Sequence, residues 1–193
     1  MARRAVDQEL SRERIMDAAR HLFITKGYRA ISMRSIGQHL GYSHGSLYYH
    51  FKEKAELFYA IVVQDFEHVY VLFDQVISRP PIAGFSTIEQ LMLEFIKFGL
   101  EHPFQYEIMF MLRDDEILAY CRSEQNKCFD KFSCIVRSYM KEGQIDPEHS
   151  SALAQSMFLG IHGFISYHIQ GRTAFEDVQS SAVQHVKNLC RCL

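Results

Sequence analysis

The sequence predicts an all-α protein of about nine helices, in which a small three-helix head precedes a larger helical body. Apolar residues recur three and four positions apart throughout the 193-residue chain, as one face of an α-helix requires. No stretch alternates apolar and polar residues for long with the β-branched enrichment that is typical of strands. Because 48% of the residues are hydrophobic, the chain can bury a substantial core.

The first three predicted helices lie close together. Ser11 can cap a helix that stops at Gly27, since serine accepts a hydrogen bond from a free N–H and glycine ends helices well. A short second helix follows Ser32 and ends at Gly41, and Ser43 can cap a third helix. Two short helices joined by a tight turn at a glycine form a helix-turn-helix, which places its second helix in the major groove of DNA.

A long helix is predicted to continue through "KEKAELFYAIVVQDFEHVYVLFDQVI", until the prolines and glycine of "SRPPIAGFS" interrupt it. Capping boxes and an aspartate before a proline indicate later helix starts, at Ser86 with Glu89, at Thr173 with Glu176, and at Asp146 before Pro147. The remaining helices are predicted at 87–101, 103–112, 116–141, 147–169 and 175–190. We therefore expect two parts, a DNA-binding head at 1–54 and a larger helical body at 55–193.

Positive charge is concentrated in the predicted head. Residues 1–54 hold ten Lys and Arg against five Asp and Glu, a net charge of +5, whereas the other residues carry a net charge of −7. This asymmetry is expected if the head binds a polyanion and the body does not. The first ten residues carry charges of both signs and no apolar run, so we expect neither a secretory signal nor a lipid anchor, and a cytoplasmic protein.

One stretch, 149–171, contains no Asp, Glu, Lys or Arg and is long enough to span a bilayer. Interior histidines, glutamines and serines make it only moderately apolar, so a helix buried in a bundle or a subunit interface explains it better than a membrane span. Gly160 and Gly163 within it would allow close approach of another helix. We expect this helix and the last one to form a four-helix dimer interface.

The segment "RERIMDAARHLFITKGYRAISMRSIGQHLGYSHGSLYYHFKEKAEL" resembles the TetR family of bacterial transcriptional regulators almost position by position. More loosely, "HPFQYEIMF" and "FLGIHG" resemble a type of TetR ligand-binding domain marked by Trp, His and Gly. Here His162 and Gly163 are present, and Phe158 replaces the usual Trp. The resemblance implies a homodimer whose two heads bind a palindromic operator, and a small ligand in the body that changes the spacing of the heads.

Position and resemblance together predict the DNA contacts. His44, Gly45 and Ser46 begin the third helix, the end that meets base edges in a docked helix-turn-helix, and family members read bases from these positions. Tyr48 and Tyr49 cannot both be buried beside Leu47 and Phe51. The resemblance implies that the tyrosines touch phosphates or thymine methyl groups. The predicted DNA-contacting residues are Ser32, Arg34, Ser43, His44, Gly45, Ser46, Tyr48, Tyr49, His50 and Lys54.

The remaining DNA candidates differ in what they would touch. His50 and Lys54 match phosphate-contacting positions, and Arg34 matches a position that reaches a base or a phosphate. Glu53 departs from the usual Ser or Asn cap and sets a negative charge beside Lys54. At the N-terminus, Arg3 and Arg4 fit either a short arm that reaches DNA or a basic end that makes no contact.

Large apolar side chains and a few histidines in the body could line a cavity for a lipophilic effector, although most large apolar side chains must form the core. Family resemblance is the main reason to expect a pocket. The predicted ligand-binding residues are Phe95, Phe98, His102, Tyr106, Phe110, Phe129, Phe132, Met157, Phe158 and His162.

Cysteine chemistry offers an alternative means of sensing. Cys121 and Cys128 are seven residues apart and so share a helix face, and Arg191 between Cys190 and Cys192 could lower a thiol pKa. Buried reduced thiols remain the simpler interpretation of an odd number of cysteines. No metal site or cofactor is predicted, because no His/Cys pair has the spacing of a helical metal site.

Two classes of function compete with a ligand-responsive repressor. An enzyme is disfavoured, since the chain has no phosphate-binding glycine loop, no nucleophile elbow and no H-E-x-x-H. The alternative that stays open is a DNA-bound organising protein of the same fold without a small-molecule effector. Partners implied by the sequence are double-stranded operator DNA, a second copy of the chain and a small apolar molecule.

Overall fold

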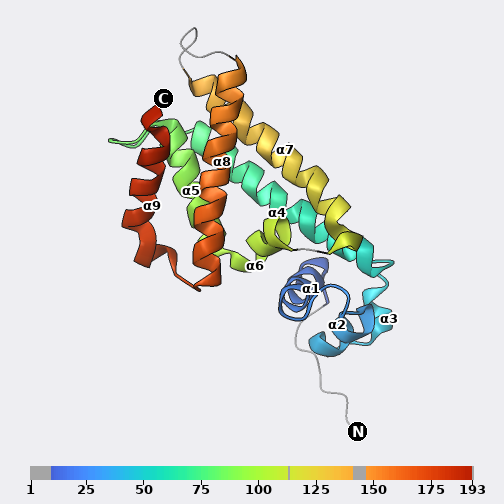
Figure 1. The fold of residues 1–193 in the computed structure, drawn as a ribbon. Coiled ribbons are helices and arrows are strands. Elements are labelled where there is room, and N and C mark those ends of the chain that lie inside the picture. The colour runs from blue at the N-terminus through green and yellow to red at the C-terminus, as the bar shows by residue number, and fades with distance from the viewer. Residues whose placement is uncertain (1–9, 113, 141–146, 193) are drawn as a thin grey trace.

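The computed structural model describes residues 10–112, 114–140 and 147–192, which include no strand and are largely helical (Figure 1). The all-α prediction is confirmed. The helices are α1 (Arg12–Lys26), α2 (Met33–Leu40), α3 (His44–Leu47), α4 (Lys54–Ile77), α5 (Thr87–Glu101), α6 (Pro103–Tyr106), α7 (Asp115–Tyr139), α8 (Pro147–Gln170) and α9 (Phe175–Leu189), with a π-helical turn at Glu107–Met111 and a 3₁₀ turn at Cys190–Cys192.

Each helix of the head begins at a serine whose side-chain oxygen accepts a hydrogen bond from a backbone N–H group. Ser11 Oγ accepts from the Arg14 N–H at 3.2 Å, and Ser32 and Ser35 form a reciprocal capping box at the start of α2. Ser43 Oγ accepts from the Ser46 N–H at 3.3 Å and so begins α3. These caps satisfy N–H groups that have no partner within the helix.

Glycine makes the turn of the helix-turn-helix possible. Gly41 has φ +79°, the left-handed conformation that ends α2 and that glycine adopts without the steric cost of a Cβ atom. At Gly37 a Cβ atom would lie 3.2 Å from the Tyr42 carbonyl oxygen and 3.3 Å from His44 Cα. The close packing of α2 against the start of α3 therefore depends on this second glycine.

α4 connects the head to the body (Figure 1). Near its beginning, Phe58 packs against Phe23 and Tyr28 of the head, with ring centroids 5.7 and 5.2 Å apart. One to two turns later, the carboxylate of Asp65 binds Arg20 of α1 through two hydrogen bonds of 2.7 and 3.0 Å. The proposed boundary between residues 54 and 55 thus falls at the start of a helix that both parts share.

The body is a layered bundle in which α4 packs on α5 and α7, α5 packs on α8 and α9, and α7 packs on α8. Phenylalanine rings fill its centre, among them the fully buried Phe73, Phe95 and Phe132. Close contact of α5 with α8 depends on Gly99, where a Cβ atom would lie 2.6 Å from Ile165 Cγ2. This packed core fixes the position of α7 relative to α8.

Most predicted helix ends in the body lie within one or two residues of the observed ends. The larger differences concern one capping box and the helix predicted at 103–112. The capping box of Ser86 and Glu89 is confirmed, with hydrogen bonds of 2.7 and 3.2 Å. The one predicted at Thr173 is wrong, because α9 begins one residue later with Ala174 as a cap that makes no side-chain hydrogen bond.

The predicted helix 103–112 consists of a single α-helical turn followed by the π-helical turn. Asp146, like Arg3 and Arg4, lies outside the described residues. In the described ranges we find no helix with the length and apolarity that a membrane span requires.

Candidate nucleic-acid interface and ligand pocket

The short helix α3 exposes the residues that the sequence predicts to meet DNA. Leu47 is fully buried and holds α3 against the head, whereas His44 and Gly45 are exposed. A Cβ atom at Gly45 would contact only Ser43 Oγ, at 3.8 Å, so the surface in front of this residue is open. Ser43 and Ser46 also join through their hydroxyl groups at 2.9 Å, which orders the exposed end of the helix.

Two adjacent tyrosines follow α3 and face solvent. Tyr49 is 92% exposed and Tyr48 is 49% exposed. The Tyr48 ring lies edge-on to that of His44, with centroids 6.2 Å apart. A contiguous exposed aromatic surface is typical of a binding site. Both tyrosines are therefore accessible for the DNA contacts that the sequence predicts.

The candidate phosphate contacts differ in how freely they can reach DNA. Arg34 is exposed in the first turn of α2. Lys54 is half-buried: its Nζ donates to the Tyr28 carbonyl at 3.0 Å and lies 3.9 Å from the centre of the Tyr28 ring. An ammonium group has three donors, so Lys54 keeps donors for a phosphate while it also stabilises the head. Glu53, which stands in place of the usual Ser or Asn cap before α4, makes no side-chain cap hydrogen bond.

Ser32 and His50 are less available than the sequence suggested. Ser32 Oγ accepts from the Ser35 N–H at 3.1 Å as part of its cap, and its hydroxyl donates to Ser35 Oγ at 3.4 Å. A phosphate would therefore compete with Ser35 for this hydroxyl donor. His50 is half-buried, and its carbonyl accepts a hydrogen bond from Arg12. The guanidinium of Arg12 lies 4.0 Å from the centre of the Phe51 ring.

Arg12 therefore connects the start of α1 to His50 and Phe51, which follow α3. Sequence analysis missed this role. Its only signal was a basic residue in the first turn of a helix, where a positive charge is unfavourable for the helix itself.

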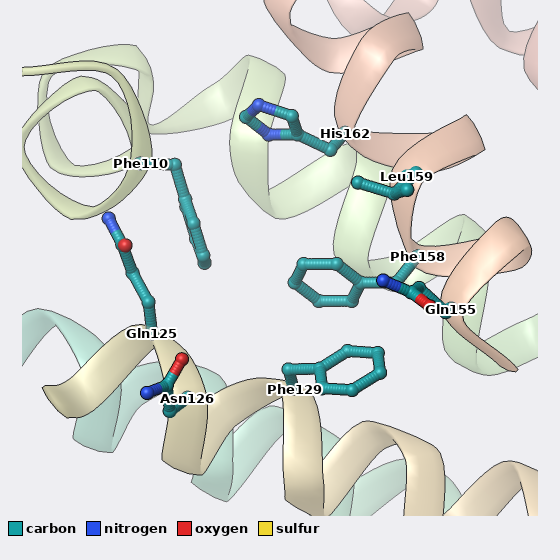
Figure 2. A pocket seen from close by; sticks show the side chains of 8 residues that line it. All are labelled: Phe110, Gln125, Asn126, Phe129, Gln155, Phe158, Leu159 and His162. Atoms are coloured by element: carbon teal, nitrogen blue, oxygen red, sulfur yellow. The ribbon is translucent and has the colours of Figure 1, made fainter. Parts of the chain in front are cut away.

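The body contains a pocket of about 240 Å³ between α7, α8 and the π-helical turn (Figure 2). Gln125, Asn126 and Phe129 come from α7, and Phe110 comes from the π-helical turn. The lining from α8 consists of Gln155, Phe158, Leu159 and His162.

Four of the predicted ligand-binding residues line this pocket, namely Phe110, Phe129, Phe158 and His162. The other six do not line it. His102 is exposed beside the head, and Phe95, Phe98, Tyr106, Phe132 and Met157 are buried in the core. Core and pocket residues share the same apolar character, so sequence could not separate them. Sequence analysis missed four lining residues: Gln125, Asn126, Gln155 and Leu159. The three amides were missed because polar residues of a helix usually face solvent.

A hydrogen-bonded pair lies behind the pocket. Tyr106 Oη lies 2.7 Å from Nδ1 of His162, and His162 Nε2 lies 3.5 Å from Ser166 Oγ. Burial lowers the pKa of His162 and raises the pKa of Tyr106 well above its ordinary value. Both side chains are therefore neutral near pH 7, and the tautomer of the imidazole decides whether Tyr106 or His162 donates in this hydrogen bond.

Three of the cysteines, Cys121, Cys128 and Cys190, are unsuited to sensing by thiolate chemistry. Burial raises the pKa of Cys121 to about 11, and of Cys128 and Cys190 to about 12. The hypothesis that Arg191 lowers the pKa of a neighbouring thiol is therefore wrong for Cys190, because burial and then the negative charge of Glu89 both raise the pKa of this thiol. Among the described residues, no cluster of three His, Cys, Asp or Glu side chains is arranged to hold a metal ion.

Comparison with known proteins covers both parts of the chain. Residues 15–61 match the family of bacterial regulatory proteins, tetR family, and residues 88–189 match the tetracyclin repressor-like C-terminal domain. The HTH-type transcriptional regulator UidR of Escherichia coli K12 is 27% identical over 157 residues, which cover 78% of this chain and 77% of UidR.

Solved structures share the fold. A transcriptional regulator from Aquifex aeolicus has a TM-score of 0.78 at 19% identity, covering 92% of this chain and 98% of its own. A TetR-family regulator from Bordetella parapertussis has a TM-score of 0.74 at 16% identity, covering 95% and 96%. The exposed recognition helix, the helical body and the family matches over both parts lead to one conclusion: the chain belongs to the TetR family and is a DNA-binding transcriptional regulator.

Proposed function

We propose that the protein is a homodimeric repressor that leaves a palindromic operator when a small molecule binds in the body. The observation that carries this proposal is the pocket between α7 and α8, in a body joined to the head by a single shared helix. DNA binding would use the ten predicted residues of the head. Such a protein acts where the chromosome is, which fits the expected cytoplasmic location.

The proposed dimer uses the outer face of α8. Leu159 is 58% exposed and Tyr167 is 73% exposed, with Gly163 between them on the same face at helical spacing. No charged residue occurs between 149 and 171. An uncharged, partly apolar face can pair with its own copy in a two-fold symmetric interface, where each residue meets its equivalent or a close neighbour.

A continuous set of contacts supports communication between pocket and head. Phe110, on the pocket wall, lies in the π-helical turn that follows α6, and Gln105 of α6 donates to Asp65 at 3.0 Å. Asp65 in turn holds Arg20 of α1. A ligand that displaced Phe110 would thus act on the elements that position the head, which is the physical requirement for coupling two sites.

A single assay tests the proposed function. Fluorescence anisotropy would compare binding of the protein to labelled duplex from its own upstream region and to scrambled duplex, at physiological salt. We expect tighter binding to the native duplex, and release when a ligand of the body is added. Equal weak binding to both duplexes would contradict regulation of its own promoter.

An organising protein without an effector is the remaining alternative. It would bind many chromosomal sites, and its DNA affinity would not change with any ligand of the pocket.

A further inference from the structure

We propose that the effector is an uncharged ring compound whose edge carries hydrogen-bonding groups. This inference rests on the proposed function and specifies the ligand of the same pocket. It replaces the broader expectation of an apolar effector.

The inner wall of the pocket is aromatic. The Phe158 ring lies edge-on to those of Phe129 and Phe110, with centroids 5.6 and 6.1 Å apart, and Phe110 lies 5.9 Å from the His162 ring. All four are half-buried and keep some surface free. Aromatic groups prefer edge-to-face and offset contacts with other rings, so a flat ring between α7 and α8 would extend this cluster.

The rim is polar but carries no charge. Gln125 and Asn126 on one side and Gln155 on the other are the polar groups beside the rings, and no Asp, Glu, Lys or Arg in the described part of the chain lines the pocket. Gln125 Nε2 donates to the Met109 carbonyl at 2.6 Å, which orients its amide and leaves its oxygen to accept. Amides both donate and accept, so they suit hydroxyl, carbonyl or amine edges of a ring.

A charged ligand would find no counter-charge among the side chains that line this site. Burial lowers the pKa of His162 and so keeps its imidazole neutral near pH 7. On α7, the neighbouring charges of Glu124 and Lys127 pair with each other at 2.7 Å. Burying an unpaired charge is costly, whereas burying a neutral ring is favourable.

The volume of the pocket favours a small, compact ligand over a long flexible chain. Ligand pockets usually measure roughly 300–1,000 Å³, and this one measures about 240 Å³. A larger hollow of about 620 Å³ lies between α1, α6 and the α8–α9 turn, but its lining includes Glu107 and Arg172. Charged probes could bind there, so the test must locate the binding site as well as measure affinity.

Calorimetry with four probes tests the ligand class: 2-naphthol, 2-naphthoate, 2-naphthylmethylammonium and dodecanoate, at pH 7.5. We expect 2-naphthol to bind at least ten-fold more tightly than each of the other three. Equal or tighter binding of any charged probe, or no binding of 2-naphthol, would overturn the proposal.

Two charge variants locate the site. Asn126→Asp adds a carboxylate to the rim, and we expect it to weaken 2-naphthoate further and to raise the affinity for 2-naphthylmethylammonium at least five-fold. The matched control Gln75→Glu adds the same charge to an exposed position of α4 and should change neither. If both variants respond alike, the probes do not bind in this pocket and the proposal fails.

Failure of the proposed function would look different. Tight binding of 2-naphthol at the pocket without any effect on operator anisotropy would support the ligand class and contradict release by an effector.

Discussion

The exposure of Tyr48 and Tyr49 supports the prediction that these side chains bind DNA and do not pack within the head. Because Tyr48 is half-exposed and Tyr49 is almost completely exposed, removal of either ring costs the folded head little. We expect Tyr48→Ala and Tyr49→Ala each to weaken operator binding about ten-fold, with a melting temperature within about 2 °C of wild type, as exposed substitutions usually allow. Anisotropy and circular dichroism would measure the two effects, and unchanged operator affinity would remove a tyrosine from the interface.

Lys54 has two roles that a salt titration can separate. If its ammonium pairs with one phosphate, Lys54→Ala should reduce the slope of log K against log salt by about one. Loss of its contact with Tyr28 should also lower the free energy of unfolding by about 1 kcal/mol. Lys26→Ala removes the same charge from an exposed position at the end of α1 and serves as the control. A stability loss with an unchanged slope would make Lys54 a purely structural residue.

His162 predicts a dependence of stability on pH. Its pKa is lowered in the folded state from an ordinary value of 6.5, so above pH 6.5 the side chain is neutral in both states. Below that pH the unfolded chain takes up a proton that the folded chain binds less readily, and stability falls as pH falls. We therefore expect the melting temperature to drop between pH 7.5 and 5.5 by less in His162→Gln than in wild type.

The exposed His149, also on α8, provides the control. His149→Gln should keep the wild-type dependence, and an identical loss of dependence in both variants would contradict the assignment to His162.

Among the elements, α1 and α4 are held together by a buried ion pair. Asp65 is fully buried, and Arg20 is nearly so. Asp65→Ala would leave the Arg20 charge without its main partner, so we expect the free energy of unfolding to fall by about 3–5 kcal/mol. Urea denaturation would measure it.

Arg20 also binds Asp17, whose side chain is 72% exposed. Asp17→Ala removes this outer carboxylate and should cost less than about 1 kcal/mol. Equal losses in the two variants would show that burial does not determine the strength of the network.

Helix positions were predictable because their signals are local. Ser11, Ser43 and Ser86 each cap the helix that they were predicted to cap, since a cap involves only neighbouring residues. The exception, Thr173, shows that spacing alone does not form a capping box. The π-helical turn after α6 was not predictable, because it has no distinct sequence signal.

The pocket was only partly predictable for a different reason. Phe95 and Phe158 are equally apolar in sequence, yet only Phe158 lines the pocket, because packing of α5, α7 and α8 decides which ring faces a cavity. Gln155 on α8 has the pattern of a solvent-exposed residue. Gln155 lies at the pocket rim because α7 packs opposite this part of α8, and the sequence pattern of α8 alone does not show this.

At the scale of the whole molecule, the two glycines of α8 have separate roles. A Cβ atom at Gly160 would lie 3.0 Å from Leu189 of α9, so this glycine serves packing within the chain. At Gly163 a Cβ atom would face open space, with no atom of the described residues within 4 Å beyond its own stretch of helix. Of these two glycines, Gly163 therefore remains available for close approach of a second copy.

This difference gives a direct test of the proposed dimer. In a single chain, the Cβ atom that Gly163→Glu adds meets no atom of the described residues within 4 Å beyond its own stretch of helix. The variant should therefore stabilise α8 by roughly 0.5–1 kcal/mol, because glycine is a poor helix former. In a two-fold dimer built on this face, it would bring two carboxylates into an uncharged interface, which is costly. We expect sedimentation velocity to show a folded monomer where wild type is a dimer, and operator affinity to fall at least ten-fold, since one head alone reaches only one half-site. A variant that stays dimeric with full operator affinity would move the interface away from this face of α8.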